Sequence, residues 1–200
     1  MYRFYLAAVD MLPGALLLAP VYLILHKAYF HNTGKSILYY LFSCYLAVVY
    51  VLVGLPNVTY IRPEVNLNLI PFVGMIGDWK NSLLNVLLFI PLGMSLPVLW
   101  SSFRAGKNAL FFGFCTSLAI ELLQMLTYRA TDINDVITNT FGTYLGFLST
   151  KILLKRSVGL AHISKSNTVV DLWLVLTVLV LIMFFAYPFV SGALWNTILS

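Results

Sequence analysis

Residues 169–190 read VVDLWLVLTVLVLIMFFAYPFV and contain a single charged residue, Asp171. A transmembrane helix needs roughly 20 predominantly apolar residues, so this stretch predicts a helix that crosses a lipid bilayer. The whole chain agrees, because 60% of its 200 residues are hydrophobic and only 10% are charged. Soluble domains average about 25% charged residues. The sequence therefore predicts an integral membrane protein.

Five more apolar stretches precede this one. They are residues 5–25, 37–55, 83–100, 109–127 and 136–154. Lipid requires every backbone polar group to be hydrogen-bonded internally, which leaves helices and closed barrels. A barrel would show alternating segments of about ten residues, whereas these stretches are continuous. We therefore expect an all-α polytopic membrane protein with about six transmembrane helices, of which 136–154 is the most polar.

The chain divides into three expected regions. Residues 1–60 hold two transmembrane helices, residues 61–155 hold an outer segment and three helices, and residues 156–200 hold a basic loop and the last helix. Residues 56–82, most of which lie in the second region, are too polar and too rich in proline to cross the bilayer. Their apolar fragments predict a piece that lies at the interface or re-enters the membrane.

The basic residues predict the orientation of the chain. The loops after the first, third and fifth helices hold eight of the twelve lysines and arginines. By the positive-inside rule these loops face the cytoplasm. Both termini, residues 56–82 and the turn at 128–135 then lie outside the cell. The net charge of +5 reports this orientation and gives no support for nucleic-acid binding, which needs a basic patch on a folded surface.

A cluster of polar residues interrupts the apolar pattern. Glu121, Asp132 and Asp135, three of the seven acidic residues, lie within fifteen positions. A helix turns about 100° per residue, so Asp135 and Asn139 lie about 300° and 340° from Asp132, on one face of the fifth helix. Asp132 and Asp135 can equally be a solvated helix cap, since Asp is favoured at helix N-termini.

Glu121 is the candidate that we expect to matter most. On the fourth helix it shares a face with Gln124 and lies roughly 10 Å below the turn that follows. An ionised side chain at mid-membrane costs about 2.5–3.5 kcal/mol, so Glu121 requires a partner or a proton. Arg129 and Arg62 are the possible partners. Glu121 is either half of a structural ion pair or part of a functional pocket, and we favour the pocket.

The motifs around these residues resemble those of the VanZ family of small bacterial membrane proteins. The shared motifs are NLIPF at 68–72, Asn85 with FIPLG at 89–93, Ser117 to Glu121 with Gln124, and ATDINDVI at 130–137 with Asn139, Thr140 and Gly142. The resemblance covers about residues 65–154. It implies a bacterial plasma-membrane protein, and some members of the family accompany resistance to the glycopeptide teicoplanin. Two departures, Arg129 where the glycopeptide-linked member has glycine and one additional N-terminal helix, leave the relevant compound open.

Together these observations predict an outward-facing pocket that acts by binding. Its residues would be Glu121, Gln124, Arg129, Asp132, Asp135, Asn139, Asn85, Arg62 and Asn68. Besides the lipid bilayer, a glycopeptide antibiotic or a lipid-linked cell-wall precursor is the expected partner. An enzyme acting on such a precursor and a small proton-coupled transporter are the alternatives. No histidine lies in the cluster, so neither a His-based metal site nor a catalytic triad is expected, and the sequence leaves cofactors and oligomeric state open.

Overall fold

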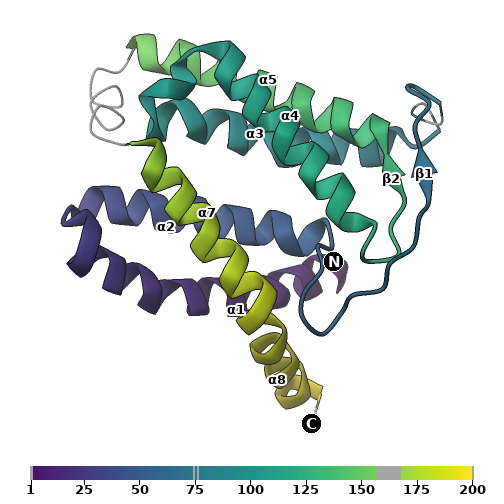
Figure 1. Cartoon of the computed structure of the whole chain (residues 1–200), viewed down its shortest axis with the longest axis horizontal. Helices are drawn as coiled ribbons and strands as arrows, with labels where there is room; N and C mark the ends of the chain where they lie inside the picture. The colour runs from purple at the N-terminus through teal and green to yellow at the C-terminus, as the bar shows by residue number, and fades with distance from the viewer. Residues whose placement is uncertain (1, 74, 76, 157–167, 200) are drawn as a thin grey trace. The chain divides into compact units, whose positions relative to one another are not determined.

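The computed structural model describes residues 2–73, 75, 77–156 and 168–199. All six expected helices form (Figure 1). The chain divides into two compact units, Met1–Ile61 with Val170–Ser200, and Arg62–Val169. The first two helices and the last therefore belong to one unit. Most of the basic loop expected before the last helix, residues 157–167, lies outside the described residues.

The unit formed by the two ends of the chain is helical throughout its regular structure. Its elements are α1 (Tyr2–Leu25), the π-helical turn η1 (His26–Phe30), α2 (Thr33–Leu52), α7 (Val169–Leu181), the π-helical turn η4 (Ile182–Ala186) and α8 (Tyr187–Leu199). The last expected helix thus extends nine residues beyond position 190. The N–H of Val58 donates a hydrogen bond of 3.0 Å to the carbonyl of Phe184 in η4. The Phe184 carbonyl thereby gains a donor in a π-helical turn, where the regular α-helical hydrogen bonds are interrupted.

A buried ion pair joins α2 to α7. The Lys35 Nζ atom lies 2.7 Å from Oδ2 of Asp171, whose side chain is buried. The hydroxyl of Tyr39 donates to the same carboxylate at 3.1 Å. Asp171 also stands in the first turn of α7, where a negative charge is favoured by the helix dipole. The only charge in the long apolar stretch is therefore neutralised inside the protein.

The second unit is a bundle of three long helices, with a short 3₁₀ turn between the first two (Figure 1). The elements are α3 (Trp79–Leu99), η2 (Ser101–Arg104), α4 (Gly106–Gln124) and α5 (Ile133–Arg156). A Cβ atom on Gly142 or Gly146 would overlap the carbonyls of Val86 or Ile90 respectively. Both pairs differ by 56 positions, so α3 and α5 run parallel, and small residues bring their backbones into close approach.

The helix α4 runs antiparallel to α5. Its Gly113 lies against the side chain of Thr143, and its Ser117 is hydrogen-bonded to Asn139. The two residue numbers of each pair add to 256, as expected when one helix ascends while its neighbour descends. The starts of α3 and α5 and the end of α4 consequently meet at the same end of the bundle. This end also carries the two short strands (Figure 1).

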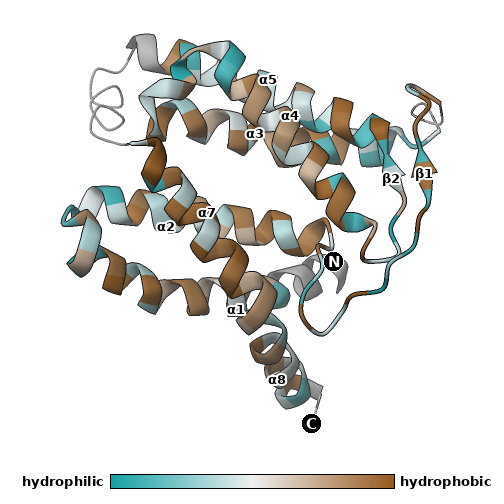
Figure 2. Ribbon diagram, in the orientation of Figure 1, coloured by the Kyte–Doolittle hydropathy of each residue, from teal (hydrophilic) through white to brown (hydrophobic). Residues whose placement is uncertain are grey.

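Four helical segments of the described chain are long and apolar enough to cross a membrane. They are Asp10–Phe30, Thr33–Leu52, Trp79–Leu99 and Val169–Ile198. The helices α4 and α5 are not among them, and both carry several polar residues within their length. Figure 2 shows the predominantly apolar helices and the polar segments between them. The all-α, membrane-type fold is confirmed: the described residues form the six expected helices, with α7 to α8 counted as one, and four helical segments meet the criteria for a span.

The outer segment lies alongside the loop between α4 and α5. Its strand β1 (Leu67–Asn68) pairs in parallel with β2 (Thr131–Asp132). Backbone N–H groups of Arg62 and Glu64 donate to carbonyls of that loop at 2.7 and 2.9 Å. Several of the segment's large apolar side chains are exposed, namely Val65, Leu67, Leu69, Ile70, Phe72 and Val73. Whether these side chains enter the bilayer stays a prediction.

Candidate functional site

The candidate site lies where two helices start and one ends. Asp78 immediately precedes α3, and Asp135 stands in the first turn of α5. The dipoles of α3 and α5, which start here, place partial positive charge at this end, and this charge favours carboxylates near the two helix starts. The three-helix bundle thereby gathers acidic side chains from separate parts of the chain at one place.

Polar side chains of α4 and α5 face each other in successive pairs along the two helices. Asn139 Nδ2 donates to Ser117 Oγ at 2.9 Å, and both residues are buried. One turn closer to the loop, the same antiparallel register puts Glu121 level with Asp135, and the two carboxyls interact electrostatically. Asn139 is buried, and its Oδ1 atom has no hydrogen-bond partner among the described residues. An acceptor without a donor is costly inside a protein, so a hydrogen bond donated to Asn139 Oδ1 would be favourable.

Glu121 lies closer to the loop than the sequence suggested. The helix α4 ends at Gln124, three residues before the expected end at 127, so Glu121 is in its last turn. Only 2% of the residue is exposed. Its Oε2 accepts the backbone N–H of Asp132 at 2.8 Å, and its carbonyl accepts the hydroxyl of Thr131 at 2.9 Å. The buried carboxylate is thus hydrogen-bonded to the segment that begins α5.

Asp132 is not on the helical face predicted for it, because α5 starts one residue later and Asp132 belongs to β2. Its Oδ2 accepts Asn68 Nδ2 at 2.9 Å across the strand pair. Its Oδ1 accepts the N–H of Asn134 at 2.8 Å, a local bond that fixes the turn into the helix. The cap interpretation of Asp132 therefore describes its geometry, and the polar face of α5 begins at Asp135.

Asp135 lies between the acidic residues and α3. The side chain of Asn85 hydrogen-bonds its carboxyl. Burial raises the pKa of Asp135 from 3.8 to about 6, and the negative charges of Asp132 and Asp78 act in the same direction. The positive charge of Arg129 acts in the opposite direction. The ionised form of Asp135 is therefore less favourable in the folded protein than it would be in water, and at neutral pH this ionisation destabilises the fold.

The remaining predicted residues lie around this centre. Gln124 is buried at the end of α4, whereas Arg129 and Arg62 are exposed on the loop and the outer segment. Arg129 acts electrostatically on Glu121 as well as on Asp135. Among the described residues, no group of three His, Cys, Asp or Glu side chains is placed to hold a metal ion. The structure therefore brings the predicted residues to one end of the bundle, where Glu121 is buried, Asp132 and Asp135 are partly buried and the two arginines are exposed.

Asn134 was not predicted, although it ties the outer segment to the site. It is buried, its Oδ1 accepts the N–H of Phe72 at 2.6 Å, and its Nδ2 donates to the carbonyl of Val73 at 3.0 Å. At 100° per residue it lies about 200° from Asp132, on the side opposite the predicted polar face. A polar residue on the apolar side of an amphipathic pattern was the signal that could have identified it.

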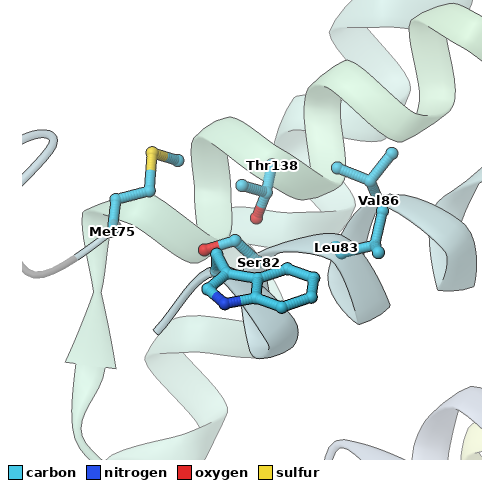
Figure 3. A pocket seen from close by; sticks show the side chains of 6 residues that line it. Met75, Ser82, Leu83, Val86 and Thr138 are labelled. Atoms are coloured by element: carbon cyan, nitrogen blue, oxygen red, sulfur yellow. The ribbon is translucent and has the colours of Figure 1, made fainter. Parts of the chain in front are cut away.

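An apolar groove of about 390 Å³ adjoins the acidic end (Figure 3). Its walls come from the segment before α3, from α3 itself and from α5. The lining residues are Met75, Trp79, Ser82, Leu83, Val86 and Thr138. Thr138 is one turn from Asp135, and Val86 follows Asn85 directly. The groove and the carboxyls are therefore neighbouring parts of one region.

The fold and the site define a multi-helix membrane protein with a cluster of carboxyls at one end of a three-helix bundle. The family model described as VanZ/LLP1 matches residues 38–154, more than half of the chain, and the chain belongs to this family. It is 39% identical over 82 residues to Protein VanZ of Enterococcus faecium. That similarity covers 40% of this chain and 50% of the relative, so the chain matches about half of the relative's length. No solved structure matches the chain.

Proposed function

We propose that this protein binds an envelope-associated ligand at the carboxyl cluster, on the outer side of a bacterial plasma membrane. By this binding it modulates the cell envelope and contributes to glycopeptide resistance of the teicoplanin type. The ligand is a glycopeptide antibiotic or a lipid-linked cell-wall precursor. Membership of the VanZ/LLP1 family and the similarity to Protein VanZ support the resistance phenotype.

The observation that carries the proposal is the level placement of Glu121 and Asp135 beside the unsatisfied Oδ1 of Asn139. Two neighbouring carboxyls repel each other, and burial adds to the cost of ionising them. A fold that only needed a helix cap would be served by Asp132 alone. The carboxyl oxygens and Asn139 Oδ1 are hydrogen-bond acceptors. A buried acceptor without a protein donor is expected where a bound ligand provides the donor.

The distribution of basic residues supports the proposed orientation. Arg104, Lys107 and Lys151 stand in η2, in the first turn of α4 and in the last turns of α5, at the opposite end of the bundle from the carboxyls. By the positive-inside rule that opposite end is cytoplasmic. The carboxyl cluster then opens to the outside, where both proposed ligands are found.

The test is to produce the protein in a susceptible bacterial host and to measure the teicoplanin concentration that stops growth. Glu121→Gln and Asp135→Asn should reduce resistance to that of cells without the protein, at unchanged membrane levels. Glu64→Gln is the matched control, because it makes the same chemical change at an exposed position of the same unit. Full resistance in both cluster variants, or equal loss in the control, would refute a binding role for the cluster.

A second candidate is catalysis on a lipid-linked envelope precursor. It is favoured by the same pair, since two carboxyls with different environments can act as general acid and general base. The two candidate functions, binding and catalysis, differ in whether the precursor is chemically converted. Purified protein incubated with a polyprenyl-linked precursor should leave it unchanged if the function is binding, and should convert it, with loss in Glu121→Gln, if the function is catalysis.

A further inference from the structure

The groove beside the carboxyls is suited to hydrocarbon. Of the six described residues that line it, four are apolar: Met75, Trp79, Leu83 and Val86. The hydroxyl of Thr138 is already bonded to carbonyls of its own helix, at 3.0 and 3.2 Å. The volume of about 390 Å³ is at the lower end of the roughly 300–1,000 Å³ typical of ligand pockets. It suits a single chain better than the bulk of a cyclic peptide.

The groove is continuous with an exposed apolar surface of α3. Most of its wall belongs to α3, one of the helices that can cross the membrane. Trp79 and Leu83 are 57% and 47% exposed, and Leu84 and Leu87 continue the exposed apolar surface along the same helix. A chain already dissolved in the bilayer can therefore enter from the side, without first passing through water.

The polar end of the groove carries negative charge. Asp135 lies one turn from Thr138 and is within electrostatic reach of Asp78 and Asp132. The positive group on the groove's own rim is Lys80, whose ammonium lies 5.9 Å from the ring centre of Trp79. Arg129 also acts electrostatically on Asp135, but the three carboxyls of Asp78, Asp132 and Asp135 outnumber the two positive groups. This excess of negative charge favours a headgroup with a positive charge, and Trp79 offers such a group a cation–π contact.

We propose that the groove binds one hydrocarbon chain of a membrane amphiphile whose positively charged headgroup lies at Asp135. This inference rests on the proposed function and names the class of ligand that the cluster takes. The chain supplies affinity by burying apolar surface, at about 25 cal/mol per Å². The headgroup supplies positive charge next to Asp135, where the negative charges of Asp78 and Asp132 also act.

The groove contains its own fluorescent reporter, Trp79. The protein is placed in nanodiscs of uncharged lipid and titrated with a long-chain alkyltrimethylammonium that carries bromine on its chain, since bromine quenches nearby tryptophan. Subtracting the quenching seen in Trp79→Phe isolates the signal from the groove. A brominated alkyl sulfate of the same length tests the charge, and tetramethylammonium tests the need for a chain.

We expect saturable quenching of Trp79 by the ammonium at a concentration about tenfold lower than by the sulfate, a difference of about 1.4 kcal/mol. Ser82→Leu, which fills the groove, should raise the half-saturating concentration of the ammonium about tenfold, again about 1.4 kcal/mol. Leu87→Phe, on the exposed surface of the same helix, should leave it unchanged. Asp135→Asn should remove the preference for the ammonium.

Quenching that never saturates, or that is equal for the two headgroups, would overturn the inference, as would an unchanged titration in Ser82→Leu. These outcomes are separable from the test of the proposed function. Loss of resistance in Glu121→Gln without saturable quenching would reject the groove and keep the cluster. Specific quenching with full resistance in Glu121→Gln would keep the groove and reject the proposed role of the cluster.

Discussion

Replacing the Glu121 carboxylate separates a structural role from a functional one. The carboxylate accepts the N–H of Asp132 at 2.8 Å, and the residue is 2% exposed. In Glu121→Gln the amide oxygen can still accept this bond. In Glu121→Ala nothing replaces it, and the Asp132 N–H loses its partner. Glu121→Gln therefore removes only the charge, whereas Glu121→Ala removes both the charge and the hydrogen bond.

The expected magnitudes follow from that bond. A buried donor without an acceptor costs about 1–3 kcal/mol, and Glu121→Ala also loses the packing of the removed atoms. A hydrogen bond to a charged group contributes about 1.5–3 kcal/mol and a neutral one about 0.5–1.5 kcal/mol, so glutamine gives up roughly 1 kcal/mol. Removing a buried negative charge that faces Asp135 offsets part of this loss. We expect the free energy of unfolding of Glu121→Gln to lie within about 1 kcal/mol of the wild type.

The assay is thermal unfolding of the purified variants in one detergent, together with membrane levels and resistance in cells. For a chain of 150–250 residues, about 1 kcal/mol shifts the melting temperature by about 2–4 °C. Glu121→Ala should melt several degrees below the wild type. Glu121→Gln should melt close to the wild type and still lose resistance.

Two results would refute this reasoning. A melting temperature of Glu121→Gln as low as that of Glu121→Ala would show that the charge itself holds the fold, as in a structural ion pair. Normal stability of Glu121→Gln with full resistance would show that the carboxylate has no functional part.

Three further predictions concern packing, pH and topology. Gly142→Ala should lower the free energy of unfolding by about 1–3 kcal/mol, because its Cβ would overlap a backbone carbonyl of α3. Gly192→Ala, which has open space around it, should be neutral or stabilising. Chemical denaturation of the two variants measures the difference. Asp135→Asn should raise the melting temperature at about pH 7.5, and the gain should shrink at about pH 4.5, because a carboxyl whose folded pKa is raised destabilises the fold only when it is ionised. A gain that is equal at both pH values would contradict this assignment. In a background without native cysteines, a cysteine at the exposed Ala130 should react with an impermeant thiol reagent outside intact cells and one at Ala105 should not, and reversed labelling would place the carboxyl cluster in the cytoplasm.

Several features of the site could be predicted from the spacing of residues alone. Glu121 and Asn139 were expected on facing polar sides of the fourth and fifth helices, and the structure buries both between α4 and α5. Helical periodicity determines this, since each helix has one polar side and the loop between them is short enough to make them antiparallel neighbours. Their function stays a proposal.

Other features had no periodic signal. Asn134 and Asp132 bond to Val73 and Asn68, partners more than sixty positions away. Lys35 pairs with Asp171 across an even longer separation of the chain. The expected depth of Glu121 was wrong because the end of α4 depends on the turn that the loop adopts, and that turn is held by the outer segment.

The sequence by itself determined the class of the protein and the existence of its six helices. Apolar length is a local property, and in lipid a helix must satisfy its own backbone, so neither result needs knowledge of the neighbours. Only the tertiary structure decided that α3 and α5 lie parallel at glycine-mediated contact, and that carboxyls from three segments meet at one end. These features depend on which surfaces pack together, and packing is set by the shapes of side chains that are distant in sequence and adjacent only in the folded chain.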